Sequence, residues 1–166
     1  SPLKRRVVIP LMTESVARNQ EGQPIGFENL EFISIFDHWL LPSEDNLLDS
    51  VKPSEWKKFW ALNELLFEKY QVFVSYSDSE ILEEVTSKEF VKGKWHSDES
   101  EGAYPMIIKI PELNCVYEEH HDYTNLFWYS DGESLEVFLE LVTSVGLFHF
   151  NQEQGFKNRN NAQSVV

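Results

Sequence analysis

The chain has 166 residues, of which 42% are hydrophobic and 14% aromatic; this exceeds what a disordered chain carries and predicts one folded domain. Its 14 Lys and Arg against 28 Asp and Glu give a net charge of −14, and this negative field argues against direct binding to nucleic acid or to an anionic membrane. The single Cys115 excludes an intramolecular disulfide and a cysteine-based zinc site. With neither a signal-peptide pattern nor an apolar run of about 18 residues, we expect a cytoplasmic protein.

The first 70 residues contain two predicted strands and one predicted helix. Residues 4–12 have the apolar content of a strand, residues 13–27 form a polar loop, and residues 28–41 suit a strand covered on both faces. Residues 54–70 predict a helix that Ser54 can cap. Large aromatic side chains at helical spacing predict that one face of this helix packs in the core: Trp56, Phe59, Trp60, Phe67 and Tyr70.

The sequence Ser-Asp-x-Glu occurs twice, at 77–80 and 130–133, each time between a strand-like and an amphipathic segment. Ser at the N-cap and Glu three residues later form a capping box, so we predict that both copies start helices, with the amphipathic segments 81–87 and 135–145. Asp78 and Asp131 could instead act as a pair of catalytic carboxylates. We prefer capping, because acidic residues in a first helical turn commonly interact with the helix dipole.

The second half of the chain predicts a meander of short strands that lie between turn residues. An additional edge strand follows the last helix, and the Asn- and Gln-rich residues 151–166 predict a disordered tail. Residues 1–150 are therefore expected to form a single α+β domain, a mostly antiparallel sheet of about five or six strands with three main helices. The strands expected in this half are 106–110, 113–119, 124–129 and 147–150.

Only residues 118–122, Glu-Glu-His-His-Asp, have the composition of a metal site. Adjacent His120 and His121 point to opposite faces in an extended segment, whereas a tight turn would bring them together. The sequence has no phosphate-binding glycine loop, dinucleotide fingerprint, serine-hydrolase elbow or HExxH motif. We therefore expect no catalytic residue, no metal and no cofactor, and keep a metal-dependent enzyme built on His120 and His121 as an alternative.

Residues 71–140 contain 16 of the 28 acidic residues and only 4 of the 14 basic ones, a distribution that attracts a basic protein. An acidic surface that serves only solubility, or an adaptor domain pairing through Phe148 and Phe150, would also fit. We favour an inhibitor that neutralises a basic partner such as a nuclease toxin, and in size and composition the chain resembles bacterial immunity proteins. The residues expected to bind the partner are the acids and aromatics of this block: Asp78, Glu80, Glu83, Glu84, Trp95, Asp98, Glu99, Glu101, Tyr104, Glu118, Glu119, Asp122 and Tyr123.

Overall fold

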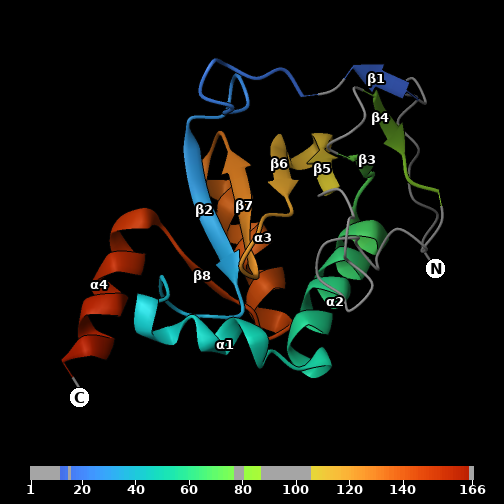
Figure 1. Ribbon diagram of the computed structural model, residues 1–166. Coiled ribbons are helices and arrows are strands. Elements are labelled where there is room, and N and C mark those ends of the chain that lie inside the picture. The colour runs from blue at the N-terminus through green and yellow to red at the C-terminus, as the bar shows by residue number, and fades with distance from the viewer. Residues whose placement is uncertain (1–11, 15, 77–80, 87–105, 165–166) are drawn as a thin grey trace.

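The computed structural model describes residues 12–14, 16–76, 81–86 and 106–164. Eight strands form one sheet in the order β1-β4-β3-β5-β6-β7-β2-β8, and every neighbouring pair is antiparallel (Figure 1). The predicted single α+β domain with a mostly antiparallel sheet is confirmed, with more strands than expected. The strands are β1 Met12–Glu14, β2 Asn29–Ser34, β3 Phe73–Tyr76, β4 Ile81–Glu84, β5 Met106–Ile110, β6 Cys115–Glu118, β7 Thr124–Tyr129 and β8 Phe148–Phe150.

Strand β2 lies between two strands from the C-terminal half of the chain. It pairs with β7 along its full length, from Asn29 opposite Tyr129 to Ser34 opposite Thr124, and with β8 on its other side. The segment after β2 and the turn before β7 therefore leave the sheet at the same end. This pairing forms the end of the sheet at which a surface pocket lies.

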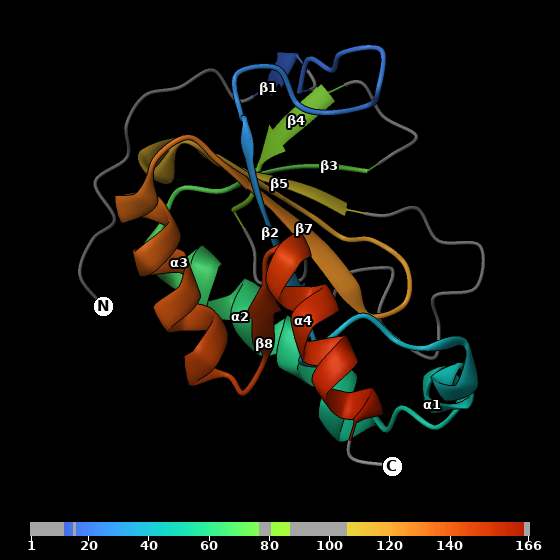
Figure 2. The same cartoon turned by 90° about the vertical axis from the view of Figure 1, so that its left-hand side faces the viewer.

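Helices α2 (Pro53–Lys69) and α3 (Gly132–Ser144) cover one face of the sheet (Figure 2). Phe127 and Tyr117 are register partners on this face, and the Phe138 ring of α3 stacks on Phe127 at a centroid distance of 3.8 Å. Burial of a side chain such as Phe138 stabilises the fold by about 1.5–3 kcal/mol. Side chains one position along each strand, such as Leu126, face the opposite side of the sheet. The aromatic stripe predicted for α2 contributes the buried Phe59 to the core.

The first Ser-Asp-x-Glu copy does not start a helix within the described residues, and this prediction is wrong. Residues 81–84 form strand β4, in which Leu82 is fully buried between the exposed Ile81 and Glu83. This alternation has the two-residue period of a strand, and pairing with both β3 and β1 outweighs the local preference for a helix. Residues 77–80 themselves lie outside the described part of the chain.

The second copy does precede a helix, although its cap differs from the predicted one. Asp131, not Ser130, is the N-cap of α3, and its Oδ1 accepts a hydrogen bond from the backbone N–H of Ser134 at 2.8 Å. The Ser130 hydroxyl instead accepts from the side-chain amide of Asn114 at 2.8 Å. In α2 the cap prediction is also wrong, because the helix begins at Pro53 and places Ser54 inside the first turn.

Residues 152–163, predicted as a disordered tail, form helix α4 (Gln152–Gln163). Asn151 caps this helix by accepting from the backbone N–H of Gln154 at 2.8 Å. Gly155 is buried against the rings of Trp39 and Phe150, where a Cβ atom would lie only 2.7 Å and 2.6 Å from ring atoms. Because Gly155 has no side chain, this polar helix can pack closely against Trp39 and Phe150. A count of apolar residues in the sequence does not detect such a contact.

The expected edge strand at 147–150 is confirmed as β8, the last strand of the sheet. Phe150 is fully buried and Phe148 is 48% exposed, so only one of the two residues predicted to pair with another copy lies at the surface. Of the strand expected over residues 4–12, only Met12 lies among the described residues, at the start of β1. Within the described part of the chain, none of the helices has the length and apolar character needed to traverse a bilayer.

Candidate functional site

Several residues predicted to bind a partner lie outside the described part of the chain, and nothing in the structure tests them. They are Asp78, Glu80, Trp95, Asp98, Glu99, Glu101 and Tyr104. Of the others, Glu83 is exposed on β4, and Glu84 accepts a hydrogen bond from Gln71 Nε2 at 3.1 Å. The remaining four are consecutive or nearly so, at the end of β6 and in the turn before β7.

Glu118 and Glu119 were expected on an exposed binding surface, and the structure buries both, at 7% and 5% exposure. Glu118 accepts a hydrogen bond from Trp128 Nε1 at 3.1 Å and forms an ion pair with Arg18. Glu119 accepts from the backbone N–H of Met106 at 3.3 Å. The burial of both carboxylates corrects the expectation that residues 118 and 119 belong to an exposed ring of acids around a partner-binding interface. The physical reason is that the loop before β2 brings Arg18 against Glu118, and the ion pair neutralises the charge of this carboxylate.

Asp122 and Tyr123 form the tight turn before β7, both with positive φ, 59° and 53°. The Asp122 side chain is 65% exposed, whereas Tyr123 packs partly against the core. The turn also brings His120 and His121 together, with ring centroids 4.0 Å apart. Among the described residues no group of three or more His, Cys, Asp or Glu side chains is arranged to hold a metal ion.

A pocket of about 250 Å³ lies where this turn meets the segment that follows β2. Its floor is formed by Phe32 and Leu126, which are register partners facing away from α2 and α3. Its walls come from residues 36–48, which include helix η1 (Pro42–Glu44) and helix α1 (Asn46–Asp49), and from residues 120–124. The lining residues are Phe32, Phe36, His38, Trp39, Leu40, Asp45, Leu48, His120, His121, Asp122, Thr124 and Leu126.

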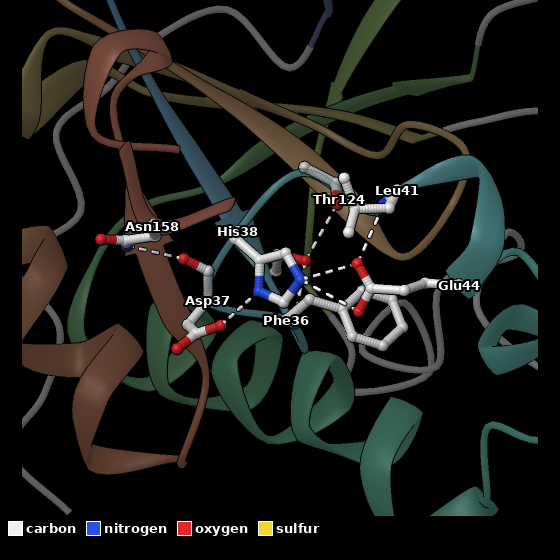
Figure 3. Close-up of polar contacts among 8 residues, drawn as sticks. Phe36, Asp37, His38, Leu41, Glu44, Thr124 and Asn158 are labelled. Atoms are coloured by element: carbon white, nitrogen blue, oxygen red, sulfur yellow. Dashed lines mark hydrogen bonds and ion pairs between the residues drawn. The ribbon is translucent and has the colours of Figure 1, made fainter. Parts of the chain in front are cut away.

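His38 fixes one wall of the pocket by contacts with two carboxylates (Figure 3). Its Nδ1 lies 2.6 Å from Asp37 Oδ1, and its Nε2 lies 3.1 Å from Glu44 Oε1. Glu44 also accepts from the backbone N–H of Leu41, and the Asn158 side chain donates to the Asp37 carbonyl. Burial by itself lowers the pKa of His38, but the hydrogen bonds and charges of the two carboxylates outweigh it and raise the pKa. Because both ring nitrogens are occupied, His38 holds the loop together and has no free nitrogen to act as a general base.

Trp39, which lines the pocket, packs between two aromatic rings. Its ring centroid lies 4.5 Å from that of Phe32 and 5.2 Å from that of Phe150, both in edge-to-face geometry. Gly155 of α4 closes on the same ring. The aromatic wall is therefore fixed before any ligand arrives.

No protein-family model matches the chain, and neither a curated protein nor a solved structure is significantly similar to it. The chemistry of its own side chains is therefore the basis for a function.

The walls of the pocket combine two acidic stretches that contain no Lys or Arg. Residues 19–51 contain seven acidic residues and residues 110–156 contain nine. The pairing of β2 with β7 brings these stretches side by side. The segments that form the pocket carry four exposed carboxylates. We name these four the acidic rim: Asp37, Asp45, Asp49 and Asp122.

Of the acidic rim, only Asp122 was predicted to bind a partner. The prediction rested on the excess of acids within one continuous block, residues 71–140, whereas the rim joins that block to residues 37–49. The available signal was the absence of any Lys or Arg between Arg18 and Lys52. A second acidic face, Glu133, Glu136 and Glu140 on α3, is exposed on the helix-covered side of the sheet.

Proposed function

We propose that this chain is an acidic protein-binding domain that neutralises a basic protein partner, such as a nuclease toxin, and that it acts in the cytoplasm. The supporting observation is the acidic rim, four exposed carboxylates that come from two sequence stretches devoid of Lys and Arg. The proposal assigns the rim to the partner and assigns no catalytic step to the chain.

Charge and surface chemistry both favour a basic partner. Among the described residues, no Lys or Arg forms an ion pair with a member of the acidic rim; Asp37 and Asp122 have only neighbouring histidines as partners. Exposed carboxylates repel one another, and a basic surface that covers them relieves this repulsion. Their negative field also accelerates the approach of a basic protein. Arg159 of α4 contributes to the lowered pKa of Glu44, after the backbone hydrogen bond from Leu41 and the contacts with His38.

The apolar residues of the pocket would add buried contact area with a partner, which charged groups alone do not provide. Protein interfaces concentrate their binding energy in buried aromatic residues surrounded by a polar rim. Here Phe36 and Trp39 line a hollow together with two members of the acidic rim, Asp45 and Asp122. This arrangement favours specific binding over a surface that serves only solubility.

The test compares two charge reversals that change the net charge equally. One variant carries Asp45→Lys, Asp49→Lys and Asp122→Lys in the acidic rim, and its control carries Glu133→Lys, Glu136→Lys and Glu140→Lys on α3. The partner is isolated by affinity capture, purified, and titrated against each variant by calorimetry. We expect the rim variant to bind at least about tenfold more weakly than the α3 control. A partner with a net negative charge, or equal binding by both variants, contradicts the proposal.

A further inference from the structure

We propose that the pocket inside the acidic rim receives one arginine side chain from the partner. This inference rests on the proposed function, because it names the group of a basic protein that would enter this site. It adds a specific chemical requirement: a planar cation between carboxylates and aromatic rings.

The charge of the pocket matches a cation. Asp45 and Asp122 line it from opposite segments, and no Lys or Arg is among its lining residues within the described chain. The positive charge of a protonated His38 is balanced by Asp37 and Glu44. Burial and the neighbouring His121 lower the pKa of His120, which favours its neutral form. The pocket therefore offers two carboxylates to an incoming cation.

The walls match a guanidinium more closely than an ammonium. A guanidinium is planar, stacks on aromatic faces and donates hydrogen bonds in a fixed fork to carboxylates. Phe36 and Trp39 supply aromatic rings, and the contacts of Trp39 with Phe32 and Phe150 hold one of them in place. Lysine presents a compact, strongly hydrated charge that gains less from such walls.

The size of the pocket favours a single side chain over a free small molecule. Pockets for drug-sized ligands and cofactors have volumes of roughly 300–1,000 Å³. The volume here is about 250 Å³, and the pocket lies open between exposed carboxylates at the surface. An arginine that projects from a protein surface can fill such a hollow while its backbone stays outside.

The experiment uses short peptides and does not need the natural partner. The full chain, labelled with ¹⁵N, is titrated with the blocked tripeptide Gly-Arg-Gly, and with Gly-Lys-Gly and Gly-citrulline-Gly as controls. Citrulline keeps the shape of arginine and lacks its charge. We expect saturable shifts of the amide signals of Trp39, His120 and Thr124 with the arginine peptide, and affinities at least about tenfold weaker for citrulline.

Variants assign the effect to the two carboxylates. Asp45→Asn and Asp122→Asn each remove one charge from the pocket and should weaken the arginine peptide by about three- to tenfold. Asp49→Asn is the matched control, because Asp49 is exposed on the same short helix as the pocket residue Leu48 and does not line the pocket. We expect this control to bind like the unmodified chain.

Three results would overturn the inference. Equal binding of the citrulline peptide would show that charge is not recognised. Free agmatine that binds far more tightly than the blocked peptide would make the pocket a small-molecule site. Absence of binding by any peptide would exclude an arginine pocket, while the charge-reversal comparison would still decide the proposed function on its own.

Discussion

Substitution of Gly155 by alanine tests how helix α4 holds the aromatic wall of the pocket. The added Cβ would lie 2.6 Å from Phe150 Cδ2 and 2.7 Å from Trp39 Nε1. Normal contacts between such atoms are about 3.5–4.0 Å, so both rings, or the helix that carries Gly155, must move by roughly 1 Å. Overpacking of this kind costs about 1–3 kcal/mol, and the better helix propensity of alanine returns about 1 kcal/mol. Because Phe32 blocks the retreat of Trp39, we expect a cost in the upper part of this range, about 2–3 kcal/mol, and therefore a net loss of about 1–2 kcal/mol of unfolding free energy.

Thermal and urea unfolding measure this loss. For a chain of this size the predicted change lowers the melting temperature by about 2–8 °C. Asn161→Ala, at an exposed position of the same helix, is the control for propensity and should be neutral or slightly stabilising. The amide signals of Trp39 should shift in the Gly155→Ala variant only. A variant as stable as the unmodified chain, with Trp39 unchanged, would refute the close contact between α4 and the aromatic wall.

Three further predictions concern buried or bridged polar groups. Since the pKa of His38 is raised in the folded chain, the stability it contributes is present below about pH 6.5 and is lost as the pH rises through the folded pKa. The loss of stability in His38→Gln should therefore be larger near pH 6 than near pH 9 in urea unfolding, and a loss independent of pH would contradict the double carboxylate bridge. Glu118→Ala removes the carboxylate that pairs with Arg18 and accepts from Trp128 Nε1, and should cost about 1–3 kcal/mol, whereas an unchanged urea midpoint would contradict this network. Cys115 is fully buried and burial raises its pKa, so a thiol reagent should react at the rate of unfolding; rapid modification of the native chain would contradict its placement.

The sheet was largely predictable because its strands follow from local pattern. Residues 106–110 and 124–129 alternate or lie between turn residues, and both occur as predicted, in β5 and β7. The failures have a common cause. Residues 81–84 have a helix-compatible composition, but neighbouring strands supply hydrogen bonds that local propensity cannot anticipate. Residues 152–163 carry few apolar side chains, and their helix depends on the fit of Gly155 against Trp39 and Phe150, which lie elsewhere in the sequence.

The candidate site was less predictable than the fold because it is assembled across the chain. Asp122 was identified from its acidic neighbourhood, while Asp45 and Trp39 join it only through the pairing of β2 with β7. Glu118 and Glu119 show the converse error. Their composition indicates a charged surface, and their position at the end of β6 places both carboxylates among buried donors.

Association kinetics at two salt concentrations give the most direct test of an acidic surface that receives a basic partner. Surface plasmon resonance with the purified partner would measure the association rate constant kon in 50 mM and 500 mM NaCl. We predict that kon falls by about tenfold or more at the higher salt, because screening shortens the reach of the acidic rim, while the dissociation rate constant changes less. A value of kon that is the same at both salt concentrations would contradict binding driven by the acidic rim.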